Sequence, residues 1–469
     1  MIKSLWKCFK TLKNMLLTTS LLVVLGYSLS WLLGPSMQTK PFQVTAHLAI
    51  AGITEDDFNA LEEDEGDVTE LSPKLIHYIL DDRAKRISDS LNIPEDLRKR
   101  VEFWFKIYAM YTISNAVLHD TDHPWVLYEV INLNSVYSNY RKAQDRKTAK
   151  SNMIRNARYK YIHVLDKLSK AKHFRNLTSD EKKVYALFKE VPGDRKLVFS
   201  KAKGRVRVQL GQKDSVVYGI KRSGRYLKSM EKIFQDQQLP IELTRIPFLE
   251  SSFNLNAYSK DGASGIWQFM YKTGKIFLNV SSAQGIDERN HPLKATRAAA
   301  KLLHQNYQIL KNWPLAVTAY NHGPGGLLQG MRKIKSQNLN DLIENYKHPY
   351  FGFASQNFYS CFLAILHVEQ YQDEIFGYLE KDKHLDHEDI EIMYSMRVKF
   401  IKEICTVSQE DIKLYNPDLR KKALSSYAYL PEGYYLKLPN GKKQCLLNFY
   451  QEVENTNRIL DKILGKDSK

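Results

Sequence analysis

The chain has 469 residues and a formal net charge of +17, and 43% of its residues are hydrophobic. This length and composition suit an exported globular protein of two or three domains with real cores. The positive charge favours an anionic partner, such as a polymer bearing carboxylates or an acidic lipid surface. Nucleic acid fits the charge alone, but the chain has no nucleic-acid-binding motif and begins like an exported protein, so we exclude nucleic acid as a partner.

The first residues combine a basic flank with an uncharged apolar run from Met15 to about Gly34. Four lysines form the flank: Lys3, Lys7, Lys10 and Lys13. A run of about twenty apolar residues can span a bilayer as a helix, and the lysines keep its amino end in the cytoplasm. We therefore predict a membrane anchor over residues 1–36. A cleaved signal peptide is the alternative, because Ser28-Leu29-Ser30 has the form of a processing site.

Residues 37–72 lack a hydrophobic pattern and include the acidic run Glu62-Glu63-Asp64-Glu65. We interpret them as a solvated tether, with an acidic binding patch as the alternative. Over residues 73–212 apolar side chains such as Phe103, Trp104 and Ile107 recur at helical spacing, which predicts an all-α amino-terminal domain. Within it, Arg205–Gln209 alternates like a short strand, although an extended approach to the next helix fits equally well.

Two features of this domain have alternative readings. The sequence His119-Asp120-Thr121-Asp122-His123 contains metal-ligand residue types, but Pro124 follows it, and aspartates in such turns commonly cap backbone groups. We therefore expect a turn and no metal ion. A basic tract follows, which we interpret as a solvated helix face, with attachment to a wall polymer or to lipid as the alternative. Its members are Arg141, Lys142, Arg146, Lys147, Lys150, Arg155, Arg158, Lys160, Lys172 and Arg175.

Glu250 is the strongest candidate for a catalytic residue. It stands in Ile246-Pro247-Phe248-Leu249-Glu250, near the end of a predicted helix, with apolar neighbours before it. Loss of hydration raises the pKa of such a carboxyl group, so it can still hold a proton near neutral pH. Glu250 is thus a candidate general acid. In isolation, a surface or salt-bridged carboxylate would be the ordinary reading.

Three further blocks follow Glu250-Ser251-Ser252-Phe253 in order: Ala257-Tyr258-Ser259, then Gly262-Ala263-Ser264-Gly265-Ile266-Trp267-Gln268, then Ala319-Tyr320-Asn321-His322-Gly323. Together these blocks resemble the catalytic domain of the bacterial lytic transglycosylases of the lysozyme-like superfamily, in particular its membrane-bound D type. Several separate blocks with matching order and spacing form a far more specific signal than one short motif. The resemblance covers about a third of the chain, from Tyr218 to Tyr371.

The resemblance implies a mainly α fold, with a lysozyme-like catalytic domain of the SLT (soluble lytic transglycosylase-like) type over residues 213–375. It implies that Glu250 is the catalytic acid, that Ser259 and Gln268 hold the muramyl residue, that Tyr320 lies near the acid, and that Asn321 shapes the pocket. The alternatives are structural: Ser259 as a turn cap, Gln268 as a helix cap, and Tyr320 as a core residue. The implied partners are peptidoglycan strands and, through residues 1–36, the inner membrane, with the catalytic domain in the periplasm.

The implied reaction needs no metal and no cofactor, because the family uses one acid. That acid protonates the bridging oxygen between N-acetylmuramic acid and N-acetylglucosamine, and then takes a proton from the muramyl 6-hydroxyl. Most glycosidases need a second carboxylate, and the nearest acid after Glu250 is Asp261, whose place in a glycine-bearing turn predicts capping. Hydrolysis by a lysozyme of the same fold and an inactive wall-binding scaffold are the alternatives.

The chain departs from the family after the third block. Related enzymes usually have a Glu-Thr pair and then a Tyr-Val on a closing helix, where this chain has Ala354-Ser355 and Phe358-Tyr359. We expect Gln356, Asn357 or Tyr359 to replace the missing groove contacts. Residues 376–469 faintly resemble a degenerate LysM-like wall-binding module. At most one disulfide is expected, and Cys405–Cys445 is the pair we name.

Overall fold

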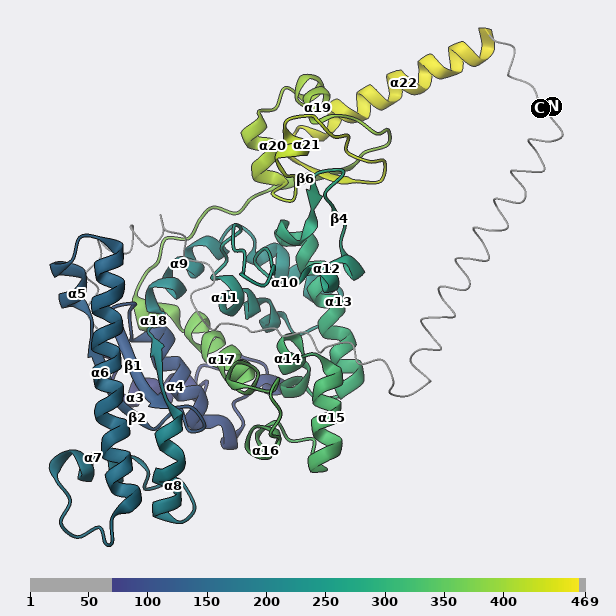
Figure 1. Cartoon of the computed structure of the whole chain (residues 1–469). Helices are drawn as coiled ribbons and strands as arrows, with labels where there is room; N and C mark the ends of the chain where they lie inside the picture. The colour runs from purple at the N-terminus through teal and green to yellow at the C-terminus, as the bar shows by residue number, and fades with distance from the viewer. Residues whose placement is uncertain (1–69, 464–469) are drawn as a thin grey trace, which may run out of the picture. The chain divides into compact units, whose positions relative to one another are not determined.

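The computed structural model describes residues 70–463, which are mainly α-helical as the sequence predicts (Figure 1). The predicted anchor at 1–36 and nearly all of the acidic tether at 37–72 lie outside these residues. Between residues 70 and 463, no helix combines the length and the apolar character needed to cross a membrane. Three hydrophobic cores organise the described residues.

The amino-terminal region contains a sheet, so the prediction of an all-α domain is wrong. Its three antiparallel strands have the order β2-β1-β3. All six residues of β1 are buried, so its sequence lacks the alternation that marks a strand with one solvated face. The strand considered at Arg205–Gln209 is confirmed as β3. The elements of this region are α3 (Pro73–Leu80), α4 (Arg98–Ala109), β1 (Asn115–Asp120), β2 (Leu127–Asn132), α5 (Asn134–Asn139), α6 (Ala143–Lys170), α7 (Ser179–Leu187), α8 (Arg195–Ala202) and β3 (Val206–Leu210).

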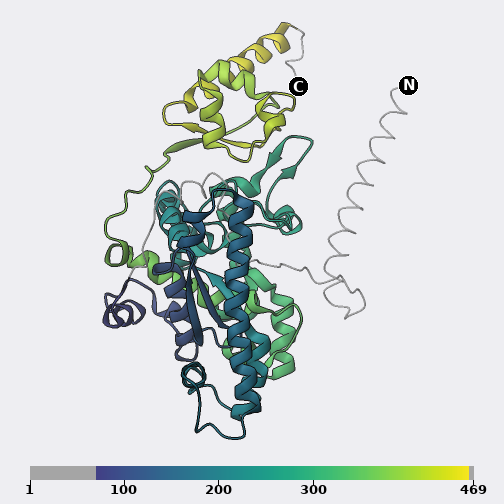
Figure 2. The same ribbon diagram turned by 60° about the vertical axis from the view of Figure 1, so that its left-hand side comes forward.

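The long helix α6 packs along this sheet (Figure 2). Tyr161 and Leu165 on its buried face join a core with Leu118 of β1 and Tyr128 of β2. The rest of α6 is mostly exposed and carries much of the basic tract, which agrees with a solvated helix face. Helix starts in this region follow local sequence; for example, Thr178 forms a capping box at the start of α7.

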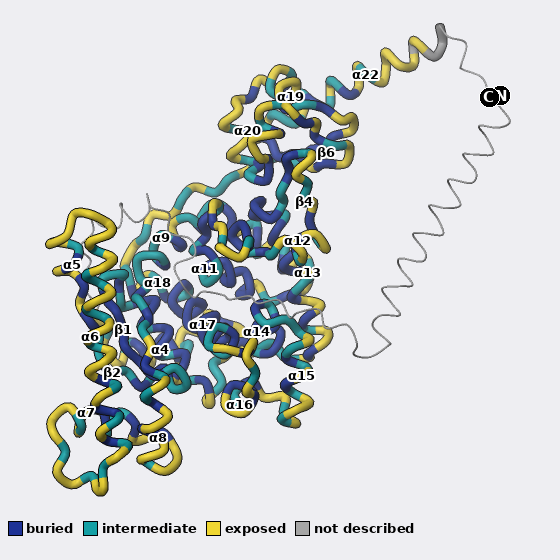
Figure 3. Tube along the Cα trace, viewed as in Figure 1, coloured by how far each residue is buried: buried dark blue, intermediate teal, exposed yellow. Residues whose placement is uncertain are grey.

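Helix α4 belongs to a different core, which it shares with the catalytic region. It lies against α17 (Phe353–Gln370), a helix buried along most of its length (Figure 3). Arg100 Nη1 and Trp104 Nε1 each donate a hydrogen bond of 3.0 Å to Oδ1 of Asn357. This core therefore includes residues that precede residue 213, the predicted start of the catalytic domain.

The region that follows residue 213 surrounds α17 with further helices and one small hairpin, β4–β5. Two of these helices, α13 and α15, begin with proline, where the missing N–H costs nothing. The elements are α9 (Lys213–Ser223), α10 (Leu227–Asp236), α11 (Ile246–Ser251), α12 (Tyr271–Phe277), β4 (Val280–Ser281), β5 (Ile286–Asp287), α13 (Pro292–Leu310), α14 (Trp313–His322), α15 (Pro324–Ile334), α16 (Leu339–Asn345), α17 and α18 (Gln372–Phe376).

The carboxyl-terminal region has its own core around an antiparallel pair of strands, β6 and β7. The predicted disulfide Cys405–Cys445 is confirmed and joins α19 to α22. The elements are β6 (His387–Glu391), α19 (Val398–Cys405), α20 (Gln409–Tyr415), α21 (Lys421–Leu424), β7 (Tyr435–Pro439) and α22 (Lys443–Ile463). The predicted boundaries at 73–212, 213–375 and 376–469 stay predictions.

Candidate active site

Glu250 lies in the last turn of α11, as the sequence predicts. A 3-10 turn (Ile241–Arg245) leads directly into this helix, and Pro247 occupies its first turn. The helix ends because Ser252 adopts a left-handed conformation with φ of 49°. A short helix that stops directly after Glu250 presents the carboxyl group at a helix terminus.

A buried ion-pair network fixes the start of α11. The guanidinium of Arg245 is almost fully buried and contacts the carboxylates of Glu231 and Glu369, with a distance of 2.9 Å from Nε to Oε2 of Glu369. Glu369 belongs to α17, so the network ties the acid-bearing helix to the central helix of the core. Paired buried charges of this kind hold geometry well, because separating them leaves an uncompensated charge.

The carboxyl group of Glu250 has no charged or hydrogen-bonding partner among the described residues. The residue keeps a small exposed fraction, yet burial raises the pKa of its carboxyl group to about 8. Burial is the sole cause of this shift, so no second carboxylate of the described residues contributes to it. Asp261, the nearest acid after Glu250 in the sequence, is exposed.

Tyr320 lies on α14, where it bonds with the neighbouring loop and interacts electrostatically with Glu250. Its hydroxyl donates a 2.7 Å hydrogen bond to the carbonyl oxygen of Trp267. Burial raises the pKa of Tyr320 well above its ordinary value, and the charge of Glu250 raises it further. The ring lies almost parallel to that of Phe358 of α17, with centroids 6.4 Å apart. Tyr320 is therefore within electrostatic range of the acid, although its proton is committed to a backbone oxygen.

Gln268 holds a tight loop of residues 257–269 together. It has a left-handed backbone with φ of 47°, and its Nε2 donates to the carbonyl oxygens of Ala257 and Gly265 at 3.2 Å and 2.8 Å. Ser259 lies in the same loop, where its Oγ accepts a 2.9 Å hydrogen bond from the backbone N–H of Ala263. Both side chains thus have structural partners, and their contacts with sugar stay predictions.

Asn321 is buried beside Tyr320, and its Oδ1 accepts a 2.9 Å hydrogen bond from Ser355 of α17. Sequence reasoning missed this partner. Ser355 occupies the second position of the missing Glu-Thr pair, and its hydroxyl can donate as a threonine hydroxyl would. The similarity of serine and threonine was the signal that could have identified it.

Of the three residues expected to replace the missing groove contacts, Asn357 and Tyr359 lie in the core, so the prediction is wrong for them, and for Gln356 it stays a prediction. Asn357 is fully buried and binds Arg100 and Trp104, as described above, so it joins α17 to α4. Tyr359 is buried in the core, and Gln356 donates to the carbonyl oxygen of Phe351. The face of a helix on which a residue lies depends on its exact phase, which the sequence did not define here.

The histidine- and aspartate-rich motif forms a turn at the end of β1. Oδ1 of Asp120 accepts hydrogen bonds from the backbone N–H groups of Asp122 and His123, at 2.9 Å and 3.0 Å. Asp120 also pairs with Arg205 at 2.9 Å. The predicted capping role is confirmed. Over residues 70–463, no cluster of histidine, cysteine and acidic side chains has the arrangement of a metal site.

Residues 229–343, which include all five candidate site residues, match the family model of the "Transglycosylase SLT domain". The chain carries an SLT domain. A "Putative tributyltin chloride resistance protein" of Alteromonas sp. (strain M-1) is 35% identical over 129 residues, which cover 27% of this chain and 60% of that protein. The "Membrane-bound lytic murein transglycosylase D" of Escherichia coli (strain K12) is 30% identical over 102 residues, or 22% of each chain. The chain thus spans less than two thirds of either relative.

Proposed function

We propose that this protein is a peptidoglycan lytic transglycosylase that uses Glu250 as its only catalytic acid and base. It cleaves the β-1,4 bond between N-acetylmuramic acid and N-acetylglucosamine and leaves a 1,6-anhydro end. The observation that carries the proposal is the carboxyl group of Glu250, whose pKa burial raises to about 8 within a matched SLT domain. Such a group holds its proton at neutral pH and can donate it.

In the first step, protonated Glu250 gives its proton to the bridging oxygen while the bond from this oxygen to the muramyl anomeric carbon breaks. In the second step, the carboxylate of Glu250 takes the proton of the muramyl 6-hydroxyl, and that oxygen bonds to the anomeric carbon. The acid is regenerated, and no water is consumed. A second carboxylate is unnecessary because the nucleophile belongs to the substrate and has a high effective molarity.

We assign substrate binding to four side chains beside the acid: Ser259, Gln268, Tyr320 and Asn321. Support comes from the shared loop of Ser259 and Gln268, and from the bond between Tyr320 and Trp267 in that loop. The hydroxyl and amide groups of these side chains suit sugar hydroxyl and N-acetyl groups. For Asn321, the bond with Ser355 supports a role in shaping the pocket from beneath.

We place this reaction in the cell envelope, where the substrate lies. The carboxyl-terminal region supports a wall-binding role because it forms a separate core, with an antiparallel strand pair and three short helices between the two strands. Anchoring in the inner membrane through residues 1–36 stays a prediction. Fractionation of cells that produce the full chain, or the chain without residues 1–36, tests it: the full chain should sediment with membranes.

The test compares two variants that each remove one acid. Glu250→Gln should lower the release of anhydro-muropeptides from purified sacculi by at least about 10³-fold, because the amide cannot donate the proton. Asp261→Asn, in the same region but exposed, should keep activity within about threefold of wild type. Mass spectrometry of the released muropeptides measures both, since the anhydro product is one water lighter than a reducing end.

Other outcomes identify the other candidates. Reducing muramic ends in place of anhydro ends would indicate hydrolysis by a lysozyme of the same fold. No digestion by the wild-type chain, with binding to sacculi retained, would indicate an inactive wall-binding scaffold. Equal loss of activity in both variants would contradict a mechanism with one acid.

A further inference from the structure

The carboxyl-terminal region docks onto the small hairpin of the SLT domain. Ile286 of β5 pairs with Leu419 in an antiparallel bridge. The backbone N–H of Asp287 donates to the carbonyl oxygen of Asp418 at 2.9 Å, and that of Arg420 donates to the carbonyl oxygen of Gly285 at 2.8 Å. Backbone bonds on both sides of the bridge fix the register between the two segments.

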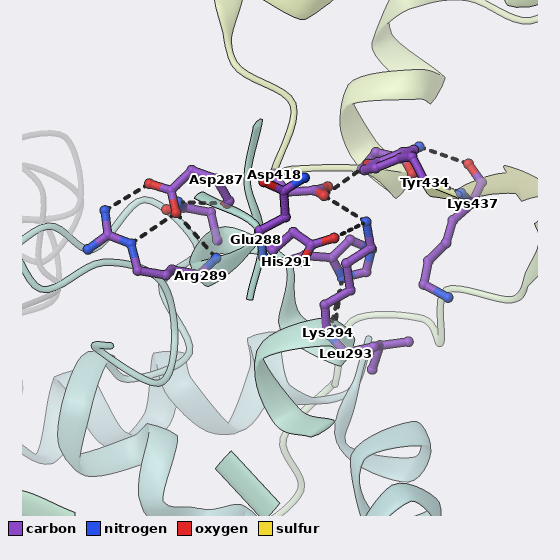
Figure 4. A network of polar contacts seen from close by, with 12 residues as sticks. Asp287, Glu288, Arg289, His291, Leu293, Lys294, Asp418, Tyr434 and Lys437 are labelled. Atoms are coloured by element: carbon purple, nitrogen blue, oxygen red, sulfur yellow. Dashed lines mark hydrogen bonds and ion pairs between the residues drawn. The ribbon is translucent and has the colours of Figure 1, made fainter. Parts of the chain in front are cut away.

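A buried ion pair reinforces this joint (Figure 4). Nζ of Lys294, on α13, contacts Oδ2 of Asp418 at 2.8 Å and Oε1 of Glu288 at 3.0 Å. Asp418 is fully buried and also accepts a 2.9 Å hydrogen bond from the hydroxyl of Tyr434. The Lys294 ammonium lies 3.8 Å from the centre of the Tyr434 ring. Buried charges with this many partners specify one docking geometry.

Asp287 contacts both sides of the joint. On the SLT side, its two carboxylate oxygens bind Arg289 through Nε at 2.9 Å and Nη2 at 2.8 Å, a planar two-point contact. On the carboxyl-terminal side, Oδ2 lies 3.6 Å from Nη2 of Arg420. One carboxylate therefore orients the arginine of the catalytic region and contacts an arginine of the docked region.

Arg289 in turn holds the loop of residues 257–269. Its Nη1 donates to the carbonyl oxygens of Gly262 and Phe269, at 2.8 Å and 3.1 Å, so one nitrogen bridges the two limbs of the loop. The next residue, Asn290, accepts a 2.8 Å hydrogen bond from the hydroxyl of Ser264. The segment around Arg289 thus supports the loop that carries Ser259 and Gln268.

We propose that Asp287 is a positioning residue, through which the docked carboxyl-terminal region holds the 257–269 loop in the geometry that binds substrate. The path runs from Arg420 to Asp287, from Asp287 to Arg289, and from Arg289 to the loop. The role of the loop in binding substrate rests on the proposed function. The chain of contacts from Arg420 to the loop does not depend on that function. The carboxyl-terminal region is then part of the active site's support and not only a wall-binding module.

Hydrogen exchange of the full-length chain tests the connection without any substrate. Asp287→Asn and Arg420→Ala should each make amides of residues 257–269 exchange at least about fivefold faster, because local opening of the loop becomes easier. The matched control is Asp389→Asn, which removes an ion pair with Lys437 inside the carboxyl-terminal region and contacts no residue of the loop. Its exchange in this loop should equal that of wild type.

Kinetics on soluble glycan strands test the consequence for the site. Asp287→Asn should raise KM about threefold to tenfold and change kcat by less than about twofold, because the loop binds substrate and does not carry the acid. Arg420→Ala should shift KM in the same direction. Arg420→Lys, which keeps the positive charge beside Asp287, should restore part of the loss.

The outcomes separate this inference from the proposed function. Wild-type exchange in the loop of both variants, with the chain folded, overturns the positioning role even if the enzyme is active. A wild-type chain that makes no anhydro product overturns the proposed function, while the exchange result still decides the connection. If Asp287→Asn does not fold, Arg420→Ala decides alone, since that side chain is 47% exposed and its loss leaves no buried charge unpaired.

Discussion

Glu250 shows how one residue obtains its chemistry from isolation. Most acids of the described residues that lie in the interior have a cationic partner, as Asp418 has Lys294 and Glu369 has Arg245. Glu250 has none, and the cost of burying its charge appears as a raised pKa. This isolation allows the carboxyl group to keep its proton at neutral pH, as the proposed reaction requires.

The pKa of Glu250 predicts the pH dependence of the proposed reaction. The carboxyl group must be protonated for the first step, and its pKa is raised to about 8, so the active form dominates below that pH. We expect kcat/KM to fall about tenfold per pH unit above pH 8 and to remain level from pH 6 to 7.5. Initial rates on soluble glycan strands across this range measure it. A fall that begins near pH 5 would mean that the acid is not buried in the working enzyme.

Gly265 is a residue whose replacement should damage the loop. Its φ is +78°, and a Cβ atom there would lie 1.9 Å from the carbonyl oxygen of Arg289. We expect Gly265→Ala to lower the free energy of unfolding by about 2–4 kcal/mol. Gly262→Ala is the control: its φ is +85°, but the nearest atom to a Cβ is the Tyr258 hydroxyl at 3.6 Å, so only the backbone strain of about 1 kcal/mol applies. Urea unfolding compares them, and equal losses would contradict the close approach to Arg289.

At the residue scale, the sequence predicted local features better than contacts between different helices. The position of Glu250 at a helix end and the capping by Asp120 follow from local pattern and are confirmed. Two contacts join different helices: Ser355 of α17 bonds with Asn321 of α14, and Asn357 of α17 bonds with Trp104 of α4. No local pattern encodes such contacts, because they depend on how α17 is rotated in the core.

Among the elements, the strands were the hardest to predict. β1 is the central strand, and its two faces pack into different cores, Val117 with α4 and Leu118 with α6, so it lacks the alternating pattern by which a strand is recognised. Apolar and polar residues do alternate along β3, so the sequence indicated a strand there as one of two alternatives. Helices such as α4 were clear because apolar residues recur along them at helical spacing over several turns, which is a longer signal than that of a short strand.

The disulfide Cys405–Cys445 should contribute measurably to the stability of the carboxyl-terminal region. It closes a loop with a sequence separation of 40 residues and connects α19 with α22. For a loop of this length the chain-entropy model gives about 3–4 kcal/mol. We expect the double variant Cys405→Ser/Cys445→Ser to melt first in the carboxyl-terminal region. Limited proteolysis under native conditions, with Cys361→Ser as the control for loss of a thiol, measures this. Equal cleavage in all three chains would contradict it.

For the molecule as a whole, the core that holds the candidate site extends beyond residues 229–343, which match the SLT model. α4 contributes Trp104 and Phe105, both fully buried, to the core that contains α11, α14 and α17. A chain that begins at residue 213 loses this helix and exposes the face of α17 that it covers. Apolar burial on this scale is worth several kcal/mol, since each large buried side chain contributes about 1.5–3 kcal/mol.

We therefore expect residues 213–469 expressed alone to aggregate or to lack a cooperative thermal transition, whereas residues 70–469 should melt cooperatively. Circular dichroism during heating compares the two fragments. A cooperative transition of the shorter fragment at the same temperature as that of the longer one would show that α4 is dispensable. The predicted boundary at residue 213 would then be a true folding boundary.

The residues that support the candidate site extend past the matched SLT stretch. The SLT match covers residues 229–343. It excludes Phe358, whose ring stacks with Tyr320, and Ser355, which bonds with Asn321. It also excludes Arg100 and Trp104, which bond with Asn357 of α17. A chimera that exchanged only residues 229–343 would contain Glu250, Tyr320 and Asn321 of one protein and the packing residues of α4 and α17 of another. Substitutions outside the matched stretch can therefore change the surroundings of Glu250, Tyr320 and Asn321 and leave the matched sequence unchanged.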